Sequence, residues 1–301
     1  MRVANAPCSW GTLEFERLEG EQIGYAQMLN ELAEAGYFGT ELGDWGYMPT
    51  HPPTLAHELD SRGLSMRGAF VPVSFSREEA VPEGLERALK TARLIAAVKD
   101  TADPPLLVLA DNNGSDAART KCAGRIDPSL QTDIGAFARR VEFIARTVRQ
   151  ETGIEVVFHH HCAGFVETPE ETAEFLASTD SETVNLVFDT GHWAYASSRF
   201  GDVSDAIDRH GDRIRHVHFK DCDPQIAESA RLNEWDYFEA VRKGVFCELG
   251  KGGVDFPCVL ERLRHIGYDG WIVVEQDVLP GMGAPKKSAA RSRAYLRSLG
   301  I

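Results

Sequence analysis

Eight short apolar runs recur along the chain, and each is followed by a longer segment with helical periodicity. The runs predict β-strands at residues 3–6, 39–42, 66–70, 106–110, 154–158, 184–188, 214–219 and 271–275. The longer segments predict helices at residues 22–35, 53–62, 77–98, 130–151, 169–177, 202–210, 257–265 and 288–299. Alternation of this kind predicts parallel strands joined by helical crossovers, and eight units favour a closed (β/α)8 TIM barrel over an open α/β sheet.

The length of the chain suits one such barrel. We expect a single domain over residues 1–301, because no low-complexity tract or long linker divides the sequence. Two stretches, 111–133 and 222–253, are interpreted as loop insertions. Both follow predicted strands, at the end where barrel loops build a site, so they are candidate lids or substrate walls. The glycine cluster at 249–253 predicts a plain turn, with phosphate binding as the alternative.

Charge and composition narrow the classes of partner. The chain has 46 acidic and 32 basic residues, a formal charge of −14 that repels polyphosphate backbones and argues against nucleic-acid binding. A small-molecule substrate fits better. No apolar stretch approaches the roughly 20 residues that cross a bilayer, and the N-terminus lacks a signal-peptide core, so we expect a cytoplasmic protein with no membrane partner. The sequence leaves a homo-oligomer open.

Three consecutive histidines, His159, His160 and His161, follow the predicted strand at 154–158. Taken alone, they indicate either a metal or proton-transfer site or a surface cluster. Strand alternation places His159 and His161 on one side of the strand and His160 on the other. His216 and His218 likewise share one side of the predicted seventh strand, and His218 is nearer to its C-terminal end.

Carboxylates stand at the ends of two further apolar runs. Asp189 follows the run at 184–188, and Glu275 ends the run at 271–275, where an unpartnered carboxylate would be costly to bury. Each residue alone is equally well explained as an ion-paired or capped strand end. One ligand from each of the last four strands gives the set His159, Asp189, His218 and Glu275. Two imidazoles and two carboxylates suit a divalent ion, for which we expect Mn²⁺ or Co²⁺, with Zn²⁺ or Mg²⁺ as alternatives.

Four motifs carry a resemblance to a known family. They are His-His-His at 159–161, Asp-Thr-Gly-His at 189–192, His-Val-His-Phe-Lys-Asp at 216–221 and Gly-Trp-Ile-Val-Val-Glu at 270–275. The chain resembles the inosose dehydratases of inositol catabolism, within the xylose-isomerase-like TIM barrel superfamily of sugar isomerases, epimerases and dehydratases. The superfamily implies a divalent metal held by two glutamates, an aspartate and a histidine. By position these fall on His159 in place of the first glutamate, and on Asp189, His218 and Glu275.

The resemblance implies a metal-dependent lyase that dehydrates a keto cyclitol such as 2-keto-myo-inositol through an enediolate. The alternative is a metal-dependent sugar isomerase or epimerase that acts on a keto sugar and returns the proton. The catalytic candidates are His161 and His192, with Glu41 or Lys220 as partners. The candidates for substrate binding are Trp10, His160 and Glu167, although the alternation also allows His160 a packing role.

Two other functions are less well supported. A multi-metal phosphodiester enzyme on the same barrel would need a basic surface for DNA, and a sugar-binding protein would hold its metal only structurally. The chain also departs from the dehydratases at Gly68-Ala69-Phe70, which lacks their lysine, at Leu249-Gly250-Lys251-Gly252, and at the short Gln276-Asp277-Val278 after Glu275. These departures lie near the expected substrate pocket.

Overall fold

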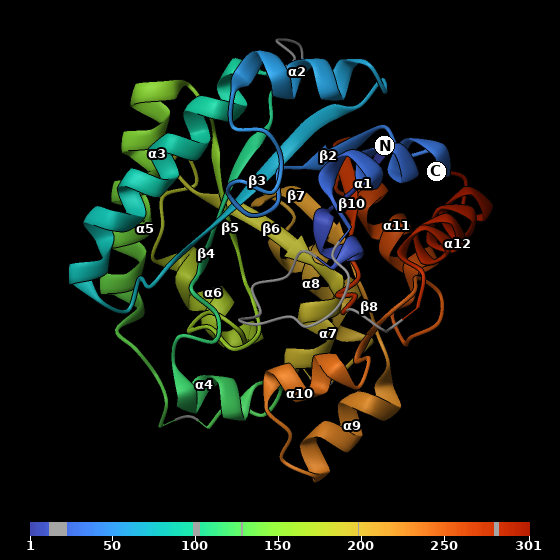
Figure 1. The fold of residues 1–301 in the computed structure, drawn as a ribbon. Helices are drawn as coiled ribbons and strands as arrows, with labels where there is room; N and C mark the ends of the chain where they lie inside the picture. The colour runs from blue at the N-terminus through green and yellow to red at the C-terminus, as the bar shows by residue number, and fades with distance from the viewer. Residues whose placement is uncertain (12–22, 99–102, 128, 198, 280–282) are drawn as a thin grey trace.

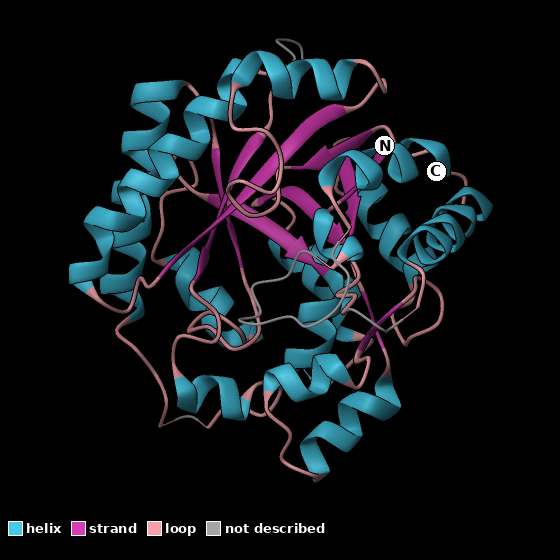
Figure 2. Cartoon of the chain, in the orientation of Figure 1, coloured by secondary structure: helices cyan, strands magenta, loops and turns pink. Residues whose placement is uncertain are grey.

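Eight parallel strands close into a barrel that is surrounded by helices (Figure 1 and Figure 2). The structure is a computed structural model that describes residues 1–11, 23–98, 103–127, 129–197, 199–279 and 283–301. The barrel strands are β1 (Arg2–Asn5), β2 (Gly39–Glu41), β3 (Ser65–Val73), β4 (Leu106–Asp111), β5 (Val156–His159), β6 (Asn185–Asp189), β7 (Ile214–Phe219) and β10 (Trp271–Val274). Their order around the barrel is β1-β10-β7-β6-β5-β4-β3-β2. The predicted single-domain (β/α)8 barrel is therefore confirmed.

The crossover helices cover the outside of the barrel. They are α1 (Tyr25–Ala35), α2 (Pro52–Asp60), α3 (Val81–Ala97), α5 (Ile134–Thr152), α6 (Pro169–Ala177), α8 (Asp202–His210), α11 (Phe256–His265) and α12 (Pro285–Ser298). The expected start of the first helix at residue 22 lies outside the described residues. The helix predicted at 77–98 divides into the 3-10 turn η2 (Glu78–Ala80) and α3, because Pro82 is tolerated only in the first turn of a helix. Of the described helices, none is both long and apolar enough to cross a membrane.

Several short elements at the C-terminal end of the barrel were not predicted from the sequence. They are η1 (Pro7–Trp10), α4 (Ala117–Cys122), α7 (Thr190–Ser197), α9 (Pro224–Leu232), α10 (Tyr237–Arg242) and the antiparallel pair β8 (Asp221–Cys222) and β9 (Phe246–Cys247). Helices α4 and α10 have six residues, too few to show helical periodicity, and α7, with eight, is buried along most of its length and has no polar face. Three of these helices begin at aspartate caps, Asp116, Asp223 and Asp236, which accept hydrogen bonds from the first-turn amides.

Alternation along the strands divides the core into two layers. In β5, Val156 and Phe158 pack against the outer helices, whereas Val157 joins Val108 and Val187 in a separate apolar cluster inside the barrel. At the N-terminal end of the barrel, the guanidinium groups of Arg2 and Arg67 lie over the ring of Trp271, 4.4 and 4.5 Å from its centroid. Trp271 Nε1 donates to Asp103 Oδ2 at 2.7 Å. The interior is thus packed at this end, and polar side chains gather at the other.

The aromatic contacts of Phe158 predict a large contribution to stability. Its ring lies 4.2 Å from Phe175, 5.8 Å from Phe137 and 6.3 Å from Phe75, measured between centroids. We expect Phe158→Ala to lower the free energy of unfolding by about 3–5 kcal/mol, because it leaves a cavity between the barrel and its helices. Urea denaturation followed by circular dichroism measures this change. Phe143→Ala is the matched control, because that ring is 52% exposed, and its effect should stay within about 0.5 kcal/mol. Equal losses in the two variants would contradict this packing.

Candidate active site

Four side chains at the C-terminal end of the barrel direct donor atoms toward one another. Nε2 of His159 lies 3.6 Å from Oδ2 of Asp189, which in turn lies 3.7 Å from Nδ1 of His218. The same Nδ1 is 3.2 Å from Oε1 of Glu275. The residues end β5 and β6, lie within β7 and follow β10, four neighbouring strands, and their donor atoms all lie within 4.8 Å of one another. The structure therefore brings together the four residues proposed from the sequence as metal ligands.

The hydrogen bonding of these residues fits a bound cation. Oδ1 of Asp189 accepts the backbone N–H groups of Gly191 and His192, both at 2.8 Å. Oδ2 of Asp189 and Nδ1 of His218 are buried and have no hydrogen-bond partner among the described residues. Buried polar atoms without partners are costly, and a cation held between them would remove that cost. Two imidazole nitrogens and two carboxylate oxygens form a donor set suited to a divalent transition metal.

Glu41, at the end of β2, determines which nitrogen of His218 faces this cluster. Its Oε1 accepts Nε2–H of His216 at 2.8 Å and Nε2–H of His218 at 3.0 Å. Because Nε2 of His218 donates to Glu41, the lone pair of the neutral ring lies on Nδ1, toward Asp189 and Glu275. Burial opposes ionisation of Glu41, but His218 and His216 outweigh it and lower the pKa of this carboxyl to about 2.

The three consecutive histidines have different environments. His161 lines the pocket, and its Nδ1–H donates to the carbonyl oxygen of Cys162 at 2.8 Å. Burial, His159 and Lys220 together hold the pKa of His161 well below its ordinary value. His160 points out of the barrel, where Nε2 accepts the backbone N–H of Asp189 at 3.2 Å, and burial lowers its pKa to about 3.

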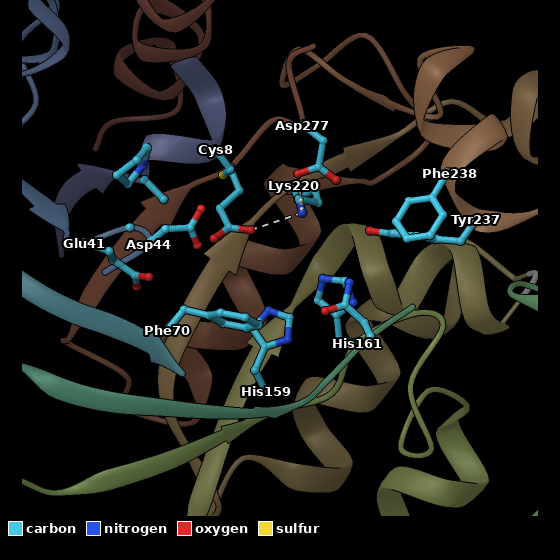
Figure 3. Close-up of a pocket in the computed structure, with 15 residues that line it drawn as sticks. Cys8, Glu41, Asp44, Phe70, His159, His161, Lys220, Tyr237, Phe238 and Asp277 are labelled. Atoms are coloured by element: carbon cyan, nitrogen blue, oxygen red, sulfur yellow. Dashed lines mark ion pairs between the residues drawn. The ribbon is translucent and has the colours of Figure 1, made fainter. Parts of the chain in front are cut away.

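A pocket opens above the donor cluster (Figure 3). Five residues that are predicted from the sequence line it: His159, His161, Lys220, Glu41 and Glu275. Further lining residues are Ala6, Pro7, Cys8, Gly43, Asp44, Phe70, Asn113, Tyr237, Phe238 and Asp277. None of these ten is predicted individually from the sequence as a site residue, but Asn113 lies in the stretch 111–133, and Tyr237 and Phe238 lie in the stretch 222–253, both predicted as candidate lids or substrate walls. Asp277 follows Glu275 by two residues, which is a weaker indication of a role in the site.

Of the residues predicted to act in catalysis or to bind substrate, four do not line the pocket in the described part of the chain: Trp10, His160, Glu167 and His192. Trp10 is buried in the core, and its Nε1 donates to Glu31 at 2.8 Å. Glu167 uses both oxygens to accept backbone N–H groups, those of Gly124 and Ala163, at 2.7 Å each. His192 lies behind His161, with 3.9 Å between ring centroids. These positions argue against direct contact with a substrate.

The glycine cluster at 249–253 is a turn rather than a phosphate cradle. The amides of Gly250 and Gly252 donate to Oδ2 of Asp221 at 2.8 and 2.9 Å. The amides of Val254 and Cys222 donate to Oδ1 of the same carboxylate at 3.1 and 2.9 Å. A buried carboxylate therefore already occupies the N–H groups that a phosphate would need.

The fold and site define an eight-stranded parallel barrel with a candidate metal centre at its C-terminal end. Residues 29–299 match the xylose isomerase-like TIM barrel model, and the chain belongs to this family.

Within the family, the chain is similar to the inosose dehydratase of Geobacillus kaustophilus (strain HTA426), with 31% identity over 99% of this chain and 94% of that protein. It is also similar to the rhizopine catabolism protein MocC of Rhizobium meliloti, with 33% identity over 95% of this chain and 84% of that protein. The structure of D-psicose 3-epimerase with D-tagatose from Clostridium cellulolyticum H10 covers 100% of this chain and 98% of its own, with a TM-score of 0.70. At 16% identity, that match shows the fold alone.

The contact between Gly68 and Glu41 predicts a sensitive position. A Cβ atom on Gly68 would lie 2.9 Å from Oε1 of Glu41, so Gly68→Ala should displace the carboxylate from His216 and His218. We expect the affinity for Co²⁺ to fall by about 10- to 100-fold, as for the loss of other partners that orient metal ligands. Titration of the metal-free protein with Co²⁺ measures this affinity. Gly201→Ala is the control, because its Cβ would have no neighbour within 4 Å, and a loss of the same size there would refute the argument.

Glu167 predicts a pH dependence of stability. Burial raises its pKa from the ordinary 4.5 to about 7, so its contribution to folding is greatest at low pH and is lost as pH rises through 7. We expect the stability advantage of the natural protein over Glu167→Gln to shrink by about 2 kcal/mol between pH ~5.5 and ~8.5. Urea denaturation of both proteins at the two pH values measures the difference. A pH-independent difference would show that the pKa is not raised.

Proposed function

We propose that this protein is a metal-dependent dehydratase that acts on a keto cyclitol such as 2-keto-myo-inositol. The observation that carries the proposal is the convergence of donor atoms from His159, Asp189, His218 and Glu275, in a chain similar to inosose dehydratases over nearly its whole length. We favour Mn²⁺ or Co²⁺ for this mixed nitrogen and oxygen donor set, with Zn²⁺ or Mg²⁺ as alternatives. A cytoplasmic location and a homo-oligomeric state stay predictions from the sequence.

A divalent ion in this centre supplies Lewis acidity, which polarises a ketone and makes the neighbouring C–H bond more acidic. We propose that His161 removes that proton. Its Nδ1–H donates to Cys162, so the lone pair of the neutral ring lies on Nε2, and the ring lines the pocket. We assign His161 as the general base.

Tyr237 is the best-placed general acid. Its hydroxyl is turned toward the middle of the pocket in Figure 3, and its ring centroid is 5.8 Å from that of His161. In the proposed reaction, the C–H proton goes to His161, the β-hydroxyl leaves with a proton from Tyr237 as water, and the resulting enol rearranges to a conjugated dione. We further propose that the stretch 222–253, which carries Tyr237 and Phe238, forms the substrate wall opposite Phe70.

The test is direct. Metal-loaded protein is incubated with 2-keto-myo-inositol, and the conjugated dione is followed by its ultraviolet absorbance. We expect the absorbance to rise with the metal present and to stay constant after chelation. Formation of an epimer or isomer from keto sugars, without dione, would instead assign the protein to the isomerases and overturn the proposal.

Asp189→Ala tests the donor cluster itself. Because Oδ2 of this carboxylate is buried and has no hydrogen-bond partner among the residues that the structure describes, we expect the variant to lose Co²⁺ binding, measured by calorimetric titration, together with dione formation. Asp269→Ala is the matched control: this exposed carboxylate lies before β10, at the opposite end of the barrel, and both measurements should remain those of the natural protein. Full metal affinity in Asp189→Ala would reject the ligand assignment.

A further inference from the structure

The ammonium group of Lys220 is surrounded by acceptors from the protein. Nζ lies 3.1 Å from Oε2 of Glu275, 3.0 Å from Oδ1 of Asp277 and 3.1 Å from Nε2 of His192. A lysine ammonium has three N–H donors: two meet the carboxylates, and the third meets Nε2 of His192 in the tautomer that carries its proton on Nδ1. The residue is 2% exposed, and Nζ also lies 4.8 Å from the ring centroid of Phe246. Lys220 could bind a substrate or transfer a proton only by giving up one of these contacts.

The contact with Glu275 separates the roles of its two carboxylate oxygens. Oε2 receives Lys220, whereas Oε1 faces the donor cluster, 3.2 Å from Nδ1 of His218. Asp189 shows the same separation, because its Oδ1 accepts two backbone amides and its Oδ2 faces the cluster. Each carboxylate therefore offers one oxygen to the cluster while the protein holds the other.

The Asp-Thr-Gly-His motif forms the surroundings of this lysine. Thr190 Oγ1 donates to the carbonyl oxygen of Lys220 at 2.7 Å and accepts its backbone N–H at 3.0 Å. A Cβ atom on Gly191 would lie 2.5 Å from Cγ of Lys220, so glycine leaves room for the side chain. His192, the last residue of the motif, accepts from Nζ. The motif thus supplies one donor to the cluster, through Asp189, and uses its other three residues to hold Lys220.

We propose that Lys220 is a positioning residue that acts through Glu275. By engaging Oε2, it keeps Glu275 to a single oxygen toward the metal and so leaves a coordination position for substrate. Without Lys220, both oxygens of Glu275 are free to coordinate. The inference rests on the proposed metal centre and differs from the sequence-based expectation that Lys220 shares in proton transfer.

The experiment compares the visible absorption of Co²⁺ bound to the natural protein and to Lys220→Met. Higher coordination weakens these bands, so we expect the variant to bind Co²⁺ at least as tightly, with its absorptivity reduced several-fold. Substrate should no longer perturb its spectrum. Lys251→Met, which removes an exposed lysine from the turn at 249–253, is the matched control and should keep the natural spectrum. Thermal denaturation of each metal-free protein verifies folding.

A second variant covers the case in which Lys220→Met does not fold. In Lys220→Ala, propylammonium should restore the natural Co²⁺ spectrum, whereas tetramethylammonium, which has no N–H donors, should not. A natural spectrum in Lys220→Met, with activity lost, would overturn the positioning role and favour proton transfer. Absence of Co²⁺ binding in the natural protein would instead reject the metal centre itself, so the two failures are distinguishable.

Discussion

Closure of the parallel sheet into a barrel is the constraint on which the remaining structure depends. Closure makes neighbours of the first strand, β1, and the last, β10, and it brings the C-terminal ends of all eight strands to one rim. His159, Asp189, His218 and Glu275 are far apart in the chain but stand on consecutive strands of that rim. Toward the opposite end, the interior is filled by Trp271 and apolar side chains, and the charged groups of Arg2, Arg67 and Asp103 pack around the Trp271 ring.

The three carboxylates buried at this rim are oriented by hydrogen bonds and ion pairs with the protein. Asp189, Glu275 and Glu41 each have protein donors, but the donors are placed differently. Asp189 and Glu275 leave one oxygen toward the donor cluster, whereas Oε1 of Glu41 accepts from two imidazoles and orients His218 from behind. Orientation by hydrogen bonds of this kind holds the proposed ligands in place without an ion, because rotation of a carboxylate would leave a buried donor unpaired.

The barrel and the placement of the three consecutive histidines could be predicted from the sequence, because each follows from a periodic pattern. The alternation of apolar runs and helical segments predicted the barrel, and the period of two within a strand predicted that His159 and His161 share a side while His160 faces away. No periodic pattern supported the substrate-binding predictions. Trp10 and Glu167 were placed near substrate, but Trp10 packs in the core and Glu167 accepts two loop amides. Tyr237 stands on a helix too short to show a pattern.

The sequence by itself determined the fold class, the order of the elements and the set of strand ends at which ionisable groups stand. These follow from local periodicity and from the rule that parallel strands end at one rim. The tertiary structure alone decided which atoms meet: that Lys220 has three acceptors, that Nδ1 of His218 faces the cluster, and that α10 brings Tyr237 over His161. The physical reason is that these contacts join side chains from different strands and loops, and side-chain rotamers and loop paths are set by packing in three dimensions.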